Sequence, residues 1–234
     1  MPRRAGDPDA RRHRIRSLTP MGGLEFLASL APTTIAVFIA LGILSVVAVT
    51  VAVFKTLQFR RMGVGRSRGA DEVLDDWLNG RPEEAMRKAG AGNSVMARVL
   101  HAVMSGLRAR PGDPGYAEEL GRQSALVELT AMNGRMRLLE AVVQAAPMLG
   151  LLGTVIGMID AFSALSLSDS AVDPATLASG IWTALTTTAI GLAIALATYF
   201  VANWLESRID TERQGIEMVI SAAIHGRVAG AGRR

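Results

Sequence analysis

Hydroxyl side chains gather inside two long uncharged stretches of this sequence. Thr154 lies in the stretch 141–159, and the stretch 175–205 contains four threonines within six residues, Thr183, Thr186, Thr187 and Thr188. A threonine in a helix can bond to a carbonyl of its own helix, so one alone says little. Four hydroxyls cannot all face lipid without a cost, and some must contact another helix, a second subunit or water. The spacing therefore indicates either helix packing or a narrow polar passage, and favours neither.

Glycines share these stretches with the threonines. Residues three or four positions apart lie on one face of a helix, and glycines there let a second helix approach closely. We expect this packing role for Gly150, Gly153, Gly157, Gly180 and Gly191.

Three uncharged runs must form the elements that position these residues: 26–54, 141–159 and 175–205. Each run is long enough to cross a bilayer, since about 20 apolar residues span its hydrocarbon core as a helix. We therefore predict an all-α, polytopic membrane protein with three transmembrane helices, at 25–57, 140–163 and 175–205.

The distribution of lysine and arginine predicts the orientation of the chain. There are 14 of them in residues 55–140, none in 160–205 and five in 206–234. The positive-inside rule then puts 58–139 and 206–234 in the cytoplasm, with the loop 164–174 and the N-terminus in the periplasm. Six arginines in residues 1–20 oppose this orientation. Either the natural chain begins at Met21, or the arginine-rich tail 1–24 is an exception to the rule.

The predicted cytoplasmic section reads as helices separated by breaks. Apolar residues recur at helical spacing over 70–79 and 93–108, and the segment 82–89 opens with a proline and two glutamates, which favour a helix start. A longer pattern runs from Tyr116 through Leu139, and no proline interrupts 116–146. We expect one helix there, which continues into the second span. The third span is likewise expected to continue past Leu205 to Ile224. Two of the three membrane helices would thus extend into a cytoplasmic helical bundle.

Several classes of function find no support in the sequence. The chain has no cysteine, and its three histidines are far apart, so no metal site and no cofactor are expected. There is no nucleophile–base set or phosphate-binding loop, so we expect no enzymatic activity. The basic residues flank the spans rather than form a compact basic domain, which argues against nucleic-acid binding.

One copy of three helices is too small to enclose a polar passage. If a passage exists, it requires a ring of several copies, with the second and third spans inside and the first span facing lipid. Its wall would carry Thr154, Thr183, Thr187 and Thr188, and Asp160 would lie at its outer mouth.

The two hydroxyl-bearing spans resemble a known family. The segment 146–158, APMLGLLGTVIGM, closely resembles the second-span signature of the ExbB/TolQ branch of the MotA/TolQ/ExbB family. Gly180-Ile181, Ala184-Leu185, the run 188–192 and Asn203 match the third-span signature in register. The resemblance covers residues 25–225.

This resemblance implies a homopentameric channel in the bacterial inner membrane that carries H⁺ or Na⁺. The channel would be the stator of a motor, and its pore would hold two helices of an ExbD/TolR-like single-span partner dimer. Ion flow would drive energy transfer to the periplasm or outer membrane, with a TonB/TolA-like effector as a further partner. Thr154 and Thr188 occupy the positions of the family's pore-lining threonines.

The sequence departs from the family pattern at Thr183, where relatives carry a glutamate, and at Ala197, where they carry a proline. Loss of the glutamate removes a candidate proton acceptor, whereas hydroxyl and carbonyl oxygens can coordinate Na⁺. Protons remain slightly favoured on family frequency. The alternatives are a passive membrane scaffold and a small solute transporter, although the repeats and broken helices typical of transporters are not visible. Which envelope process is driven stays open.

Overall fold

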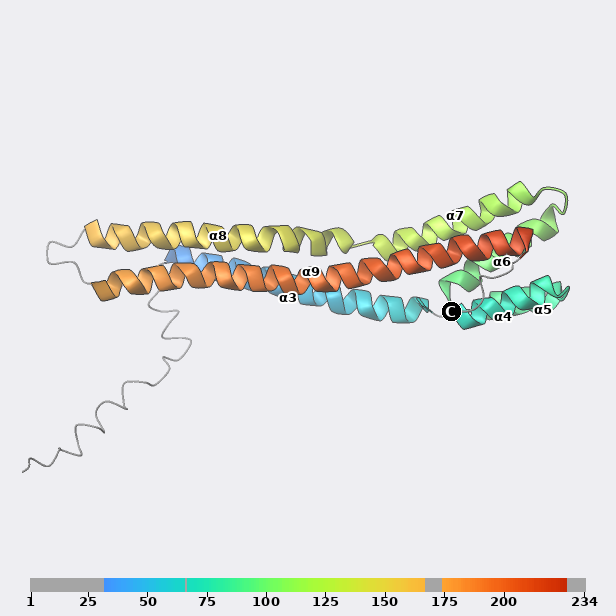
Figure 1. The fold of residues 1–234 in the computed structure, drawn as a ribbon, viewed down its shortest axis with the longest axis horizontal. Helices are drawn as coiled ribbons and strands as arrows, with labels where there is room; N and C mark the ends of the chain where they lie inside the picture. The colour runs from blue at the N-terminus through green and yellow to red at the C-terminus, as the bar shows by residue number, and fades with distance from the viewer. Residues whose placement is uncertain (1–31, 66, 167–173, 227–234) are drawn as a thin grey trace, which may run out of the picture.

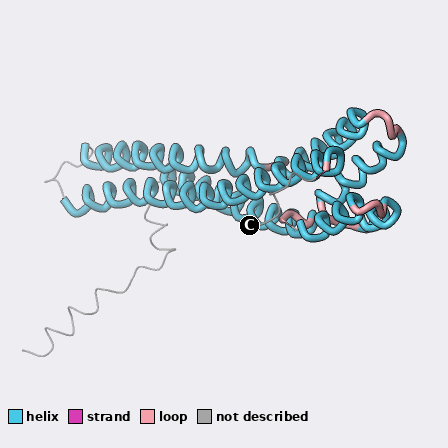
Figure 2. Tube along the Cα trace, turned by 45° about the vertical axis from the view of Figure 1, so that its right-hand side comes forward, coloured by secondary structure: helices cyan, strands magenta, loops and turns pink. Residues whose placement is uncertain are grey.

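The computed structural model describes residues 32–65, 67–166 and 174–226, and within these ranges it contains helices and no strands (Figures 1 and 2). The helices are α3 (Pro32–Met62), α4 (Ser67–Leu78), α5 (Pro82–Ala91), α6 (Val95–Ala109), α7 (Pro114–Asn133), α8 (Met136–Ser166) and α9 (Pro174–His225). The tail 1–24 and most of the loop 164–174 lie outside the described residues.

The helices form an elongated molecule with two parts, which differ in composition (Figure 1). In the hydrophobic part, α3, α8 and the first half of α9 lie side by side. The charged part consists of α4–α7 together with residues 206–225 of α9. Three helical segments of the described chain are long and apolar enough to cross a membrane. They are Pro32–Met62, which is α3, Pro114–Ser163, which contains α7 and most of α8, and Leu177–His225, which is most of α9. The prediction of an all-helical protein with three membrane helices is thereby confirmed.

Helix α3 has the surface expected of a lipid-facing span. Large aliphatic side chains are exposed along it, namely Ile39, Ile43, Val46, Val49 and Val53. The helix continues beyond the apolar run to Met62 and ends in a turn where Gly63 and Gly65 have φ values of +67° and +81°. Glycine suits this left-handed backbone because it has no Cβ.

Helix α9 runs without interruption for 52 residues and joins the two parts of the molecule. It continues past Leu205, as the sequence predicts. In the charged part it packs against α6 through a core that contains Val99, Leu100, Ile209 and Ile216.

The expectation of one helix from residue 116 into the second span is wrong. α7 ends at Asn133 and α8 begins at Met136, with Arg135 between them in the left-handed region at φ 66°. The backbone N–H of Gly134 caps α7 by donating to the Thr130 carbonyl. A left-handed residue directly after the cap commonly ends a helix, and here Arg135 takes this conformation in place of the usual glycine. α8 itself passes through Pro147.

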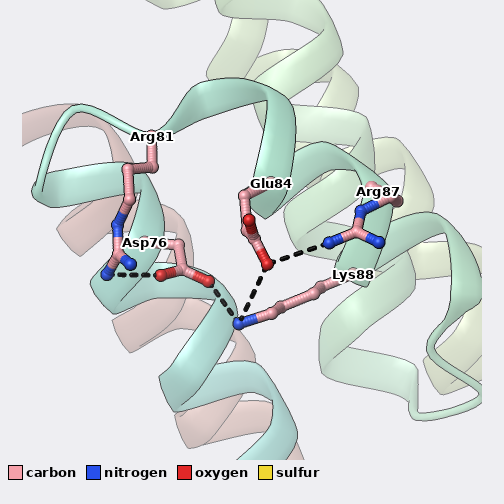
Figure 3. Close-up of polar contacts among 5 residues, drawn as sticks. All are labelled: Asp76, Arg81, Glu84, Arg87 and Lys88. Atoms are coloured by element: carbon pink, nitrogen blue, oxygen red, sulfur yellow. Dashed lines mark hydrogen bonds and ion pairs between the residues drawn. The ribbon is translucent and has the colours of Figure 1, made fainter.

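A cluster of ion pairs joins α4 to the turn after it and to α5 (Figure 3). The buried Asp76 carboxylate accepts from the Lys88 ammonium at 2.6 Å, and its other oxygen lies 2.6 Å from an Arg81 nitrogen. Glu84 pairs with Arg87 at 2.9 Å and lies 3.7 Å from Lys88. The hydrogen bond from Lys88 holds the pKa of Asp76 below its usual value, and the same bond raises the pKa of Lys88.

These pKa shifts predict that the α4–α5 hairpin loses stability in acid. A carboxyl group whose pKa is lowered by folding stabilises the fold above its unfolded pKa, about 4, and the gain is lost as pH falls through the folded value. An Asp76→Asn variant should therefore have a lower thermal unfolding midpoint than the wild type at pH 7, and the difference should shrink below about pH 4. A difference that stays constant into strong acid would show that Asp76 does not act through its charge.

Candidate functional site

The candidate site begins at the seam between α8 and α9, which run antiparallel side by side (Figure 1). At its centre the two backbones touch. A Cβ atom built on Gly191 would lie 2.5 Å from the Ala146 carbonyl oxygen and 3.1 Å from the Gly150 Cα. A Cβ atom on Gly150 would lie 3.0 Å from the Thr188 Cα. Only glycine fits at these two positions without moving a backbone.

The other glycines singled out in the sequence lie along the same seam. A Cβ atom on Gly157 would lie 2.9 Å from the Ala184 Cβ, and one on Gly180 would lie 2.7 Å from the Ala161 Cβ. A Cβ atom on Gly153 would lie 2.5 Å from the Thr187 hydroxyl oxygen and 3.0 Å from Val37 of α3. The structure thus brings all five glycines into contacts with a facing helix.

Two threonine hydroxyls of α9 converge on a single carbonyl of α8. The Gly150 oxygen accepts from Thr188 at 2.9 Å and from Thr187 at 3.2 Å. Thr187 also donates to the Ala184 carbonyl at 2.7 Å and is 0% exposed, while Thr183 is 8% exposed. Thr183 and Thr187 are therefore buried within one copy of the chain.

Thr154 and Thr188 differ from this pair because both are half-buried. Thr154 follows Gly153 and Thr188 follows Thr187, so each is turned about 100° around its helix from a residue in the seam. Because α8 and α9 are antiparallel, a step of one residue along each chain rotates the side chain toward the same edge of the helix pair. Thr154 and Thr188 therefore lie at one edge of the seam. The Thr154 hydroxyl donates to the Leu151 carbonyl at 2.6 Å, and this leaves its oxygen lone pairs as acceptors.

The edge that carries Thr154 and Thr188 adjoins apolar surface that no other described residue covers. The exposed side chains are Met148, Leu151, Val155, Ile159 and Phe162 on α8, and Trp182, Leu185, Leu192, Leu196 and Phe200 on α9. An open groove along α8 is lined by Thr154, Phe162, Ser163 and Ser166, among others. Ser163 and Ser166 are not among the residues predicted from the sequence, although their spacing of three residues on one helix was a usable signal.

Asp160 lies near the end of α8 and is half-buried. Its carboxylate accepts from the Thr33 hydroxyl at 2.9 Å, so it joins α8 to the first turn of α3. Thr33 could not be anticipated as its partner because the two residues are 127 positions apart. No carboxylate occurs within 141–159 or 175–205, so the polar atoms there are hydroxyl and carbonyl oxygens.

Comparisons with known proteins identify the family that this chain is similar to. Residues 91–218 match a model of the MotA/TolQ/ExbB proton channel family. An ExbB homolog from Methanothermobacter thermautotrophicus is 33% identical over 148 residues, which are 63% of this chain and 50% of the relative. ExbB-like 3 from Synechocystis sp. is 28% identical over 164 residues, 70% of this chain and 77% of the relative.

The biopolymer transport protein ExbB1 of Vibrio cholerae is 35% identical over 89 residues, 38% of this chain and 39% of that protein. The chain thus spans half the length of the archaeal relative and about two fifths of the Vibrio protein. The family match includes all of α8 and most of α9, and therefore the whole seam.

Proposed function

From the premise that this chain belongs to the MotA/TolQ/ExbB proton channel family, in its ExbB branch, we propose that it is an ion-channel and stator subunit of a membrane motor. It would use the H⁺ or Na⁺ gradient across the inner membrane to drive energy transfer to the periplasm or outer membrane. Family members of this kind act as channel and motor subunits rather than as enzymes, and we propose the same for this chain.

The observation that carries the proposal is the edge beside the closed seam. α8 and α9 touch through their backbones at Gly150 and Gly191, so no ion can pass between them within one copy. Thr154 and Thr188 nevertheless remain half-buried at the edge, next to uncovered apolar side chains. Other helices must complete a polar route that runs past these two hydroxyls.

The missing helices would come from further copies of the chain and from a partner. We propose a homopentameric ring around an ExbD/TolR-like dimer, with α8 and α9 inside and α3 toward lipid. The runs 141–159 and 175–205 contain no carboxylate, so the partner's single span would supply the group that binds and releases the ion. A TonB/TolA-like effector would receive the work.

In this arrangement the charged part lies in the cytoplasm, and the N-terminus and the 164–174 loop lie in the periplasm. The lysine and arginine distribution supports this orientation, with 14 of these residues in 55–140 and none in 160–205. Asp160 would then lie at the outer mouth of the route.

The composition of the complex tests the proposal. The chain should be purified with a co-expressed single-span partner, and the intact complex should be weighed by mass spectrometry under native conditions. We expect five copies of the chain and two of the partner. A chain that stays monomeric in nanodiscs, with or without the partner, would contradict the proposal.

The coupled ion can be identified separately. Ion flux into vesicles that contain the complex should be measured with and without Na⁺ across a pH series. A requirement for Na⁺ would support coordination by hydroxyl and carbonyl oxygens in the absence of the glutamate at Thr183. Dependence on pH alone would exclude sodium coupling.

A further inference from the structure

Two buried charged side chains have no counter-charge among the described residues. Lys55 is 0% exposed and Glu212 is 2% exposed, and neither forms an ion pair within the described ranges. A buried charge is costly unless strong hydrogen bonds replace its water. Each of these side chains instead bonds to backbone, and each does so at a break between the two parts of the molecule.

Lys55 of α3 reaches the end of α7. Its ammonium donates to the Met132 carbonyl at 2.6 Å, and the Gln58 amide donates to the Ala131 carbonyl at 3.1 Å. The last carbonyls of a helix lack partners within the helix and form the negative end of its dipole. The end of α7 thus supplies the negative partner that the buried ammonium needs. Arg135, which lies in the break, places its guanidinium over the Phe54 ring of α3, 4.4 Å from the ring centroid.

Glu212 of α9 reaches the other break. Its carboxylate accepts from the backbone N–H of Gly65 at 2.9 Å, in the turn that follows α3. A carboxylate that accepts from a backbone N–H makes a charge-assisted bond, which is stronger than a bond between neutral groups. The turn contains the left-handed Gly63 and Gly65, so its own backbone preferences do not hold it rigid.

The chain passes between the hydrophobic and charged parts three times. α9 crosses as a continuous helix, whereas the other two crossings are interrupted, at Gly134–Arg135 and after Met62. If α9 were the only rigid connection, the charged part could rotate about the axis of that helix relative to the hydrophobic part. A second and a third fixed crossing remove this freedom.

We propose that the hydrogen bonds of Lys55 and Glu212 hold the hydrophobic part and the charged part together as one rigid body. In a subunit that carries ion-driven force, such rigidity would prevent the charged part from twisting when the membrane part is loaded. This purpose rests on the proposed function, whereas the rigidity itself can be measured without any ion gradient.

The absence of cysteine from the chain allows site-directed spin labels to test this directly. Labels at Val127 of α7 and Met148 of α8, which are 69% and 71% exposed, report the distance across the Gly134–Arg135 break. A second pair, at Val53 of α3 and Asp71 of α4, which are both exposed, reports the distance across the turn after α3. Labelled protein is diluted with unlabelled protein so that only distances within one copy are read.

Lys55→Met should at least double the width of the first distance distribution, and Glu212→Met should do the same for the second. Met keeps the length of each side chain but removes its hydrogen bond. Arg60→Met, which removes an exposed charge from the last turn of α3, should leave both widths unchanged. Glu212→Gln, which keeps an acceptor oxygen, should also retain the wild-type width. Wild-type widths in both Met variants would overturn the proposal.

A measurement on the wild-type protein covers the case in which a variant does not fold. The N–H of Gly65 lies outside any helix and donates to Glu212, so its hydrogen exchange should be as slow as that of the adjoining residues of α3. Fast exchange at Gly65 would overturn the role of Glu212. A wild-type complex that lacks ion flux but shows narrow distance distributions and slow hydrogen exchange at Gly65 would contradict the proposed function. The proposed roles of Lys55 and Glu212 would still be supported.

Discussion

Gly191→Ala is expected to destabilise the protein by about 3 kcal/mol, near the upper end of the usual cost of overpacking a core. The added methyl group would lie 2.5 Å from the Ala146 carbonyl oxygen and 3.1 Å from the Gly150 Cα. Both are backbone atoms of α8, so no side chain can rotate away. The two helices must separate, and the hydrogen bonds from Thr187 and Thr188 to Gly150 must lengthen. The thermal unfolding midpoint of the purified protein measures the effect.

Gly42→Ala is the matched control for this prediction. Gly42 is also in the interior of a membrane helix, but a Cβ atom built there has no atom within 4 Å. Alanine favours a helix by about 1 kcal/mol over glycine, so this variant should be as stable as the wild type or slightly more stable. An equal loss of stability in both variants would mean that the close contact between α8 and α9 is not the cause of the effect of Gly191→Ala.

Removal of the Thr154 and Thr188 hydroxyls should reduce ion flux at least tenfold. Valine keeps the shape of threonine, but it offers neither a lone pair nor a proton to a passing ion or water. In the Thr154→Val, Thr188→Val double variant the glycine contacts of the seam are retained, so the complex should still assemble. Flux is measured in proteoliposomes that contain the chain with its partner, and assembly is measured by native mass.

Thr186→Val serves as the control for this double variant. Thr186 is half-buried on the same helix, and its hydroxyl donates to the Trp182 carbonyl at 2.8 Å, within α9. Flux through this variant should match that of the wild type. If the double variant assembles and conducts as well as the wild type, the hydroxyls serve only in packing, and a passive scaffold becomes the better interpretation.

The membrane helices were predictable because the physics that specifies them is local in sequence. A run such as 141–159 must cross a bilayer or be buried, whatever surrounds it. The glycine spacing was also informative, since residues three or four apart share a helix face before any tertiary contact forms. The prediction that Gly150 and Gly191 pack against a helix needed no knowledge of which helix that would be.

The roles of the individual threonines could not be predicted in the same way. Four hydroxyls in six residues spread around more than half of α9, and the sequence does not say which side meets α8. The structure separates them: Thr187 is buried against Gly150, whereas Thr188, one residue later, lies at the edge of the seam. This distinction depends on the packing of two helices rather than on composition.

The break between α7 and α8 and the buried charges escaped prediction for a related reason. No proline marks the end of α7, and the left-handed residue after its cap is an arginine, which rarely adopts this conformation. The contact that holds the end of α7 comes from Lys55, which is 77 residues away. A lysine that follows an apolar run normally indicates a membrane boundary, and only the folded arrangement shows that this one is buried.

Chemical labelling of introduced cysteines is the most direct test of the central claim, that Thr154 and Thr188 face water inside an assembled complex. The chain has no cysteine of its own, so Thr154→Cys, Thr188→Cys and the lipid-facing control Ile43→Cys can each be probed alone. A charged, membrane-impermeant thiol reagent reacts with the thiolate, which forms only where water is present. The cysteines at 154 and 188 should react, and the reaction should block ion flux, whereas the cysteine at 43 should not react. If the cysteines at 154 and 188 are as inert as the one at 43, no aqueous route passes these residues and the account is wrong.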